Sequence, residues 1–292
     1  MGAVQHADAT AASSHDGEPL RYAVRGRGAP ILVHNGLVSS VGHWRFFVPH
    51  FAERHAVVTW DYRGHGGRPA PRDLASCSVG RFAADGHAVL RAAGLAPAVV
   101  AGLSFGVQVA LEHYRRHPDD VRALVLLCGT YGHPLDRVSS SPRVRRAVAD
   151  AARVFGRTGR LGKAMLALGA RTPLTREIAF RTGGAHRELC PREVLDDLFG
   201  HVAGMDPRVV GAVVASYLEH SAADVLTEIA VPTLLIAGDC DQLTPLPVAE
   251  KMHRLIRGSR LVVFPGHSHL VQVEKPRAVH AAVDAFLAEL PG

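Results

Sequence analysis

The feature that most constrains this chain is the pentapeptide at residues 102–106, which reads G-L-S-F-G. It follows an apolar run at residues 98–101 that is typical of a short buried strand, and it precedes a helical pattern over residues 107–117. A sharp turn between a strand and a helix needs glycines, because larger residues would collide with the two elements that it joins. The pattern therefore predicts that Ser104 lies at the tip of such a turn, where its hydroxyl group can attack a carbonyl carbon.

The composition limits the class of protein. The chain has 292 residues, of which 47% are hydrophobic, and this is enough for one large core or two small ones. No apolar run approaches the roughly 18 residues that a membrane-spanning helix needs. The first residues lack the basic start and apolar stretch of a secretory signal, and the four cysteines have no close spacing. We therefore expect a cytoplasmic protein without a disulfide framework or a zinc site.

Basic residues are concentrated in one segment of the chain. Residues 137–187 hold eleven arginines and Lys163 against Asp150 and Glu177, and the net charge of the whole chain is +6. Such a segment can attract anionic substrates, a membrane surface or nucleic acid. The segment holds only two aromatic residues, Phe155 and Phe180, and no series of aromatic residues interleaves with the arginines as platforms for base stacking, so we expect no nucleic-acid partner. We interpret the segment as a solvated helix face and expect no membrane association, with binding to an anionic surface as the alternative.

Short apolar runs alternate with helical patterns along most of the chain. This alternation predicts the α/β class, with a mostly parallel central sheet and helices on both faces. Ligands of such sheets bind beyond the carboxyl ends of the strands, where Ser104 is expected. The expected strands are residues 20–24, 31–33, 56–60, 98–101, 123–128, 233–237 and 261–264, and the expected helices are residues 44–53, 78–93, 107–117, 245–256 and 276–287.

The alternation is interrupted once, between residues 132 and 221. This stretch has several helical patterns and no convincing strand, and the pair Asp206-Pro207 is typical of a helix start. It is too long for a connecting loop. We therefore expect a helical cap domain over residues 132–221, inserted into a core domain that residues 1–131 and 222–292 form together.

Three motifs resemble those of the α/β-hydrolase fold family. Residues 102–106 match its G-x-S-x-G turn, and residues 238–245, G-D-C-D-Q-L-T-P, resemble its G-[DE]-x-D-x-x-x-P signature. Residues 265–269, P-G-H-S-H, resemble the loop that carries the family's histidine. The resemblance extends over almost the whole chain from Leu20 onward and is weakest in the helical segment. It implies an α/β-hydrolase fold with an inserted cap, of the serine-esterase type.

This resemblance implies a catalytic triad in the chain order Ser, Asp, His. Ser104 is then the nucleophile, Asp241 the acid that orients the histidine, and His269 the general base. Acyl transfer needs these groups because a serine hydroxyl is a poor nucleophile until a histidine takes its proton.

Two positions of the triad have an alternative. Asp239 also ends the strand after the helical segment, but the family pattern assigns the role to Asp241, and we expect Asp239 to fix the loop through backbone hydrogen bonds. His267 stands two residues before His269. The spacing from His269 to the following Glu274 matches the family better, so we expect His267 at the pocket rim or exposed.

Backbone N–H groups are expected to form the oxyanion hole. One is that of Phe105, next to the nucleophile, and the other is that of Leu37, in the loop after the strand at residues 31–33. The family usually has His-Gly before this second residue, whereas this chain has Asn35-Gly36. A glycine still permits the turn, and we therefore expect the oxyanion hole to be retained.

Four further residues are candidates for the substrate pocket: Asn35, Trp44, Tyr131 and His267. Each also has a structural alternative, namely a turn position for Asn35 and core positions for Trp44 and Tyr131. Residues 61–66, D-Y-R-G-H-G, resemble the family's D-x-R-G-x-G turn. We expect this turn to be structural and braced by an Arg–Asp pair.

The sequence therefore predicts a serine hydrolase that cleaves a carboxylic ester, thioester or lactone of a small acyl substrate through an acyl-enzyme. This chemistry needs no metal and no organic cofactor, and the histidines lack the H-E-x-x-H spacing of a zinc site. C–C bond hydrolases, aminopeptidases, perhydrolases and acyltransferases use the same triad and stay open as alternatives. A ligand receptor without turnover also stays open. The sequence indicates neither the natural substrate nor the oligomeric state.

Overall fold

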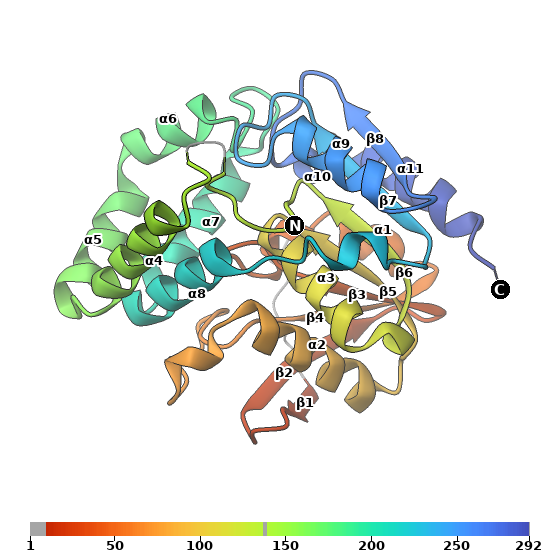
Figure 1. The fold of residues 1–292 in the computed structure, drawn as a ribbon, viewed down its shortest axis with the longest axis horizontal. Coiled ribbons are helices and arrows are strands. Elements are labelled where there is room, and N and C mark those ends of the chain that lie inside the picture. Colours follow the sequence, from red (N-terminus) through yellow and green to blue (C-terminus); the bar gives the residue numbers. More distant parts are fainter. Residues whose placement is uncertain (1–9, 137–138, 292) are drawn as a thin grey trace.

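A computed structural model describes residues 10–136 and 139–291. Its centre is a sheet of the strands β1 (Thr10–Ser13), β2 (Pro19–Arg25), β3 (Ala29–His34), β4 (His55–Trp60), β5 (Ala98–Leu103), β6 (Val121–Leu127), β7 (Thr233–Gly238) and β8 (Arg260–Phe264). The strand order is β1-β2-β4-β3-β5-β6-β7-β8 (Figure 1). The run from β4 to β8 is parallel throughout, and β2 is antiparallel to both of its neighbours at one edge. The α/β fold class that the sequence predicts is confirmed.

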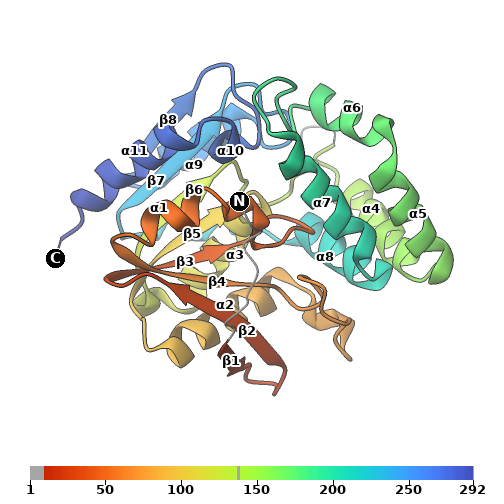
Figure 2. The ribbon, with the colours of Figure 1, turned by 180° about the vertical axis from the view of Figure 1, so that it is seen from behind.

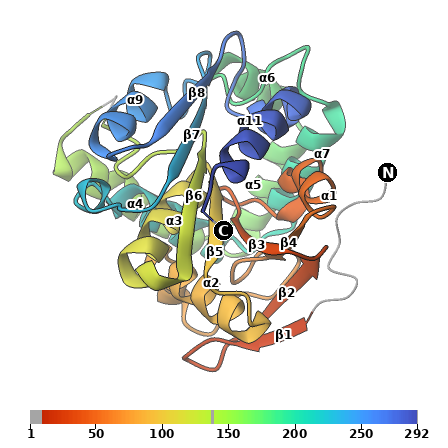
Figure 3. The same ribbon diagram turned by 90° about the vertical axis from the view of Figure 1, so that its right-hand side faces the viewer.

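Helices cover both faces of this sheet (Figure 3). Successive side chains of a strand point to opposite faces, and β5 follows this rule. Ala98 and Val100 pack into the core beneath α2 (Val79–Ala93), α3 (Phe105–Arg116) and α9 (Leu246–Leu255). Val99 and Ala101 pack into a second core beneath α1 (Phe47–Phe51) and α11 (Pro276–Ala288). The short helix α10 (Val271–Glu274) precedes α11.

A helical insertion, defined here as residues 132–221, separates β6 from β7. Its helices are α4 (Pro142–Gly156), α5 (Arg160–Arg171), α6 (Pro173–Arg181), α7 (Arg192–Gly204) and α8 (Pro207–Glu219). They gather at one side of the sheet, as Figures 1 and 2 show in green and turquoise. Gly211 lets α8 approach α4 closely, because an added Cβ there would lie 2.4 Å from the carbonyl oxygen of Ala152. In the described ranges, no helix is long and apolar enough to cross a membrane.

Two expected elements differ from the structure. The strand β1 is not predicted by the sequence, because Thr10–Ser13 consists of small residues without an apolar alternation, and only its pairing with β2 makes it a strand. The helix expected at residues 44–53 is divided into a 3-10 turn, Val41–Trp44, and the short helix α1. Pro49 lacks the N–H group that would bond to residue 45 in a longer helix. The other expected strands and helices are confirmed to within a few residues.

Candidate active site

The turn that carries Ser104 joins β5 directly to α3. Ser104 has φ of +57° and ψ of −117°, a backbone conformation that L-residues rarely adopt. The two glycines of the turn are needed because the backbone packs closely against them. An added Cβ at Gly102 would lie 2.3 Å from the carbonyl oxygen of Gly106, and one at Gly106 would lie 2.3 Å from that of His34. The predicted strand–turn–helix arrangement is therefore present.

Three side chains from distant parts of the chain meet at this turn. Ser104 Oγ lies 2.8 Å from His269 Nε2, and His269 Nδ1 lies 2.7 Å from Asp241 Oδ2. Ser104 follows β5, Asp241 follows β7 and His269 follows β8, so the parallel sheet brings the three loops to its carboxyl edge. Asp241 and His269 are buried. This hydrogen-bonded chain can transfer a proton from a serine hydroxyl to an imidazole that a carboxylate orients.

The carboxylate of Asp241 is held by its own loop. Its Oδ1 accepts hydrogen bonds from the backbone N–H groups of Leu243 and Thr244, at 2.8 and 2.9 Å. Its Oδ2 accepts a further bond of 2.6 Å from the hydroxyl of Thr244, which also lies 3.2 Å from His269 Nδ1. Thr244 is not among the residues that the sequence predicts for the site. The available signal is a threonine three residues after an aspartate, a spacing that favours such local hydrogen bonds.

The two alternative residues lie outside this chain of hydrogen bonds. Asp239 Oδ1 accepts a bond of 2.7 Å from the backbone N–H of Gly266, and this bond braces the loop as expected. His267 is buried, with its Nδ1 2.7 Å from the carbonyl oxygen of Pro265. This differs from the expected rim or exposed position, because the neighbouring carbonyl group and the ring of Phe264 fix the imidazole.

The two residues expected to form the oxyanion hole lie beside Ser104. Phe105 is the first residue of α3, so its N–H group belongs to the positive end of the helix. Leu37 lines the same cavity as Ser104, and the preceding Gly36 lies close to the serine side chain. Val38, the next residue, has φ of +46°, a strained conformation for a β-branched residue. The loop thus stores strain directly beside the serine.

A cavity of about 540 Å³ opens at Ser104, and most of its lining is apolar. The insertion contributes Pro134, Leu135, Leu195, Leu198, Val214 and Leu218, and the remainder of the chain contributes Leu37, Leu103, Leu243 and Leu270. Besides the serine and His269, the polar residues of the lining are His43, Thr182, Tyr217, Gln242 and Thr244. Burial lowers the pKa of His43 to about 4, so this imidazole is neutral at pH 7.

None of the four pocket candidates lines this cavity. The side chain of Asn35 is buried and donates a bond of 2.8 Å to the carbonyl oxygen of Trp60, while it accepts one of 3.1 Å from the indole of Trp44. Both of its polar ends are therefore used inside the fold. Trp44 is completely buried, and Tyr131 lies under the ammonium group of Lys251, 5.1 Å from its ring centre. With His267, these expected pocket positions are corrected to structural ones.

The arginine of the turn at residues 61–66 pairs with aspartates from two other segments of the chain. The guanidinium of Arg63 is buried and lies 2.7 Å from both Asp85 and Asp16. Asp85 comes from α2 and Asp16 from the loop between β1 and β2. Hydrogen bonds from Arg63 hold the pKa of Asp16 well below its usual range. The expected Arg–Asp brace therefore exists, and it joins three separate segments.

Comparison with known proteins agrees with this architecture. A family model described as alpha/beta hydrolase fold matches residues 29–276. A non-heme haloperoxidase of Rhodococcus erythropolis is 27% identical over 94% of this chain and 98% of its own length. A protein of Azorhizobium caulinodans named as a carbamate hydrolase, RutD, is 35% identical, but the match spans only 40% of this chain and 43% of that protein. The solved structure of a thermophilic esterase from Thermogutta terrifontis is 25% identical, with a TM-score of 0.76 over 97% of this chain and 98% of the esterase.

Proposed function

The chain belongs to the alpha/beta-hydrolase fold family. We propose that it is a serine hydrolase that cleaves carboxylic esters, with thioesters and lactones as related substrates. The observation that carries the proposal is the hydrogen-bonded chain of Ser104, His269 and Asp241 at the floor of an apolar cavity. The likeness to the esterase from Thermogutta terrifontis supports ester cleavage.

In the proposed mechanism Ser104 Oγ attacks the carbonyl carbon of the ester, and His269 Nε2 takes the hydroxyl proton. The carbonyl oxygen becomes an oxyanion, which the N–H groups of Leu37 and Phe105 stabilise. When the tetrahedral intermediate collapses, the alcohol leaves with the proton from His269. A water molecule then gives a proton to His269 and attacks the acyl-serine, which releases the acid and restores the serine.

The cavity lining supports a substrate with an uncharged, apolar acyl group. An aminopeptidase needs a carboxylate that binds the substrate's amine, and among the described residues no aspartate or glutamate lines this cavity. Asp196 pairs with Arg176, and Asp197 pairs with Arg45. The two other acids of residues 188–197, Glu188 and Glu193, are likewise absent from the lining. Burying an unpaired charge among these leucines would cost several kcal/mol.

We further propose that the helical insertion acts as a cap over the serine. Residues from α6, α7 and α8 form one wall of the cavity, and the backbone of Gly183 bonds to the loop of His269. A cap in this place excludes bulk water from the acyl-enzyme and limits the size of the acyl group.

Labelling with a fluorophosphonate tests the triad. We expect one adduct per chain, located by mass spectrometry on Ser104, with loss of the adduct in Ser104→Ala and in His269→Ala. His267→Ala is the matched control and should keep the adduct, because His267 does not contact the serine. Labelling of His269→Ala at the rate of the parent protein would overturn the proposed triad.

Initial rates on p-nitrophenyl esters test the chemistry and the substrate class. We expect kcat/KM for neutral alkyl acyl groups to exceed that for an acyl group with a free carboxylate by at least about 100-fold. The same assay in the presence of hydrogen peroxide or an acceptor alcohol separates hydrolysis from perhydrolysis and acyl transfer. Tight binding of ester analogues without product release would instead support a receptor.

A second candidate function, docking on an anionic lipid surface, is favoured by the outer face of α5. Leu161, Met165 and Leu168 are 65%, 53% and 69% exposed, and their spacing places them in one stripe of the helix. An apolar stripe of this kind flanked by cations is typical of helices that lie on membranes. The flanking basic side chains, all exposed, are Arg160, Lys163 and Arg171.

Sedimentation with vesicles tests this second function. The protein should pellet with phosphatidylglycerol–phosphatidylcholine vesicles at low salt and remain in the supernatant with phosphatidylcholine alone. The double variant Leu161→Ser/Leu168→Ser should lose the pelleting, whereas Val24→Ser, at an exposed valine of β2, should keep it. Absence of pelleting would exclude the lipid surface. A dimer that dissociates in the double variant would assign the stripe to a second copy of the chain.

A further inference from the structure

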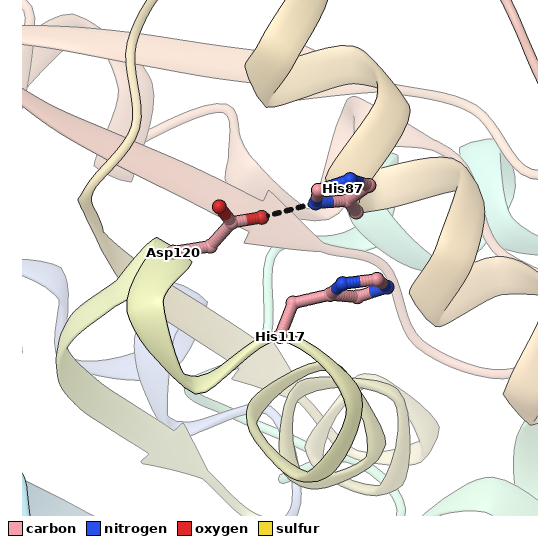
Figure 4. Close-up of side chains that lie close together, drawn as sticks. All are labelled: His87, His117 and Asp120. Atoms are coloured by element: carbon pink, nitrogen blue, oxygen red, sulfur yellow. Dashed lines mark hydrogen bonds and ion pairs between the residues drawn. The ribbon is translucent and has the colours of Figure 1, made fainter.

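A cluster of two histidines and an aspartate lies far from Ser104, at the opposite end of α3. It contains His87 from α2, His117 at the end of α3, and Asp120 from the 3-10 turn that follows (Figure 4). The helix α3 has 12 residues and is therefore about 18 Å long. The cluster consequently takes no part in the chemistry proposed for the serine.

The ligating atoms of these three residues converge. One nitrogen of each imidazole and one carboxylate oxygen all lie within 4.8 Å of one another. His87 Nδ1 is 2.5 Å from Asp120 Oδ2, and the rings of His87 and His117 are stacked, with centroids 3.8 Å apart and planes 7° apart. In the described part of the chain, no other group of three histidines, cysteines or acids has its ligand atoms this close together.

We propose that His87, His117 and Asp120 bind a divalent cation of the zinc(II) class. Imidazole nitrogens and a carboxylate oxygen are the ligands that zinc prefers besides thiolates, at distances of about 2.0–2.2 Å. Three protein ligands leave the fourth tetrahedral position for water, and the cluster borders a solvent-open depression that both histidines line. The ring of His117 has no hydrogen-bond partner among the described residues, so it can bind a metal ion without breaking a bond.

The surroundings of Asp120 support this assignment. The aspartate is almost completely buried, whereas the side chain of His87 is 31% exposed. The site therefore combines a carboxylate that the fold holds in place with a side that solvent and a metal ion can reach. Behind Asp120, the ring of His113 is completely buried, and its Nε2 has no hydrogen-bond partner although it lies 3.5 Å from Asp120 Oδ2. A ligating carboxylate is commonly oriented by such a second donor. Arg91, the nearby cation, faces the other oxygen, Oδ1, at 3.7 Å.

Metal binding changes the bonds of the cluster in a defined way. The cation takes the place of the hydrogen between His87 Nδ1 and Asp120 Oδ2, and the neutral ring of His87 carries its single N–H hydrogen on Nε2 instead of Nδ1. Because Asp120 and this nitrogen are 2.5 Å apart, the pair must open by several tenths of an ångström to reach tetrahedral geometry. The bound cation would join α2 to the end of α3 and stabilise the folded chain by mass action.

Calorimetric titration of the full chain with ZnCl₂ tests the proposal. The protein should carry no histidine tag and should first be freed of metal with a chelator. We expect one zinc ion per chain and a rise of the thermal unfolding midpoint with zinc. The affinity should fall by more than about 100-fold in His117→Ala and in His87→Gln. Circular dichroism and labelling of Ser104 show whether each variant is folded, independently of metal.

A matched control comes from a second stacked pair of histidines. His50 and His280 have centroids 4.3 Å apart, and His50 Nε2 lies 2.7 Å from Asp284 Oδ2, but the three do not converge as the proposed ligands do. His50→Ala should therefore bind zinc as the parent does. The proposal is overturned if the parent takes up no zinc, if folded His117→Ala and His87→Gln keep the affinity, or if His50→Ala loses it equally.

Discussion

The carbonyl oxygen of Gly183, in the helical insertion, accepts a hydrogen bond of 2.9 Å from the backbone N–H of His269. Gly183 follows α6 and has φ of +60°, and an added Cβ would lie 2.1 Å from the carbonyl oxygen of Cys240. Cys240 directly precedes Asp241. The backbone of one glycine is thus packed against both loops that carry the proposed acid and base, and no larger residue fits there without a shift of those loops.

The substitution Gly183→Ala should therefore impair activity more than its position in the insertion implies. We expect kcat on a neutral ester to fall at least about 10-fold, because small displacements of catalytic groups slow catalysis strongly. The free energy of unfolding should fall by about 2–4 kcal/mol, since a Cβ is forced into the backbone. Steady-state kinetics and urea unfolding measure the two effects.

Gly258→Ala is the matched control for this prediction. Gly258 has φ of +72°, but no atom lies within 4 Å of an added Cβ. Only the left-handed backbone conformation is then penalised, by about 1–2 kcal/mol, and kcat should stay unchanged. Equal kcat values for the two alanine variants would contradict the role assigned to Gly183.

The hydroxyl of Thr244 is predicted to position the proposed acid. Thr244→Val removes the bond of 2.6 Å to Asp241 Oδ2 and leaves the volume of the side chain nearly unchanged. We expect kcat to fall about 10-fold with little change in KM, because the bond acts on the catalytic groups and not on the substrate. Thr244→Ser keeps the hydroxyl and should restore most of the rate. A loss of rate in Thr244→Ser as large as in Thr244→Val would indicate a packing role instead.

The sequence predicts those parts of the fold that depend on residues close together in the chain, such as an apolar run or a glycine turn. All residues of β5 are buried, and the sequence shows this as a continuous apolar run that ends in the glycine turn at Ser104. The chain order of Ser104, Asp241 and His269 follows from the family's motifs, and the structure brings the three side chains together. Their catalytic roles stay predictions that the labelling experiment tests.

The parts that the sequence does not predict depend on partners far away in the chain. Asn35 follows a strand that leads to the site, as a pocket residue would, but Trp44 and Trp60 use its amide inside the fold. The two aspartates that pair with Arg63 come from two other segments of the chain. A side chain's direction is decided by such tertiary partners, which no local pattern encodes.

Glu274 is predicted to stabilise the junction between the insertion and the loop of His269. Its Oε1 accepts a bond of 2.8 Å from the backbone N–H of His186, and its Oε2 accepts one of 2.9 Å from that of Ser268. Glu274→Ala leaves both N–H groups without this partner and should lower the free energy of unfolding by about 2–3 kcal/mol. Glu289→Ala, at an exposed glutamate paired with Arg260, is the control and should lower it by less than about 1 kcal/mol. Denaturant unfolding of both variants decides the comparison.

The buried carboxylate of Glu112 makes the stability of the protein depend on pH. Burial opposes its ionisation, but hydrogen bonds from His220 and Arg116 and the charge of Arg115 outweigh burial and lower the pKa of Glu112 to about 2. A carboxyl group whose pKa is lower in the folded state than in the unfolded state stabilises the fold above the unfolded value and loses this effect as the pH falls. The relevant window runs from the ordinary value of 4.5 down to about 2.

Glu112→Gln should therefore lower the free energy of unfolding by about 2 kcal/mol at pH 7. The difference from the parent protein should shrink as the pH is lowered from about 4.5 towards 2, because the parent's carboxylate is then protonated as well. Glu53→Gln, at an exposed glutamate, provides the control and should change stability by less than about 0.5 kcal/mol at every pH. Urea unfolding at several pH values measures the difference, and a difference that stays constant down to pH 2.5 would show that Glu112 stabilises the fold by packing and not by its charge.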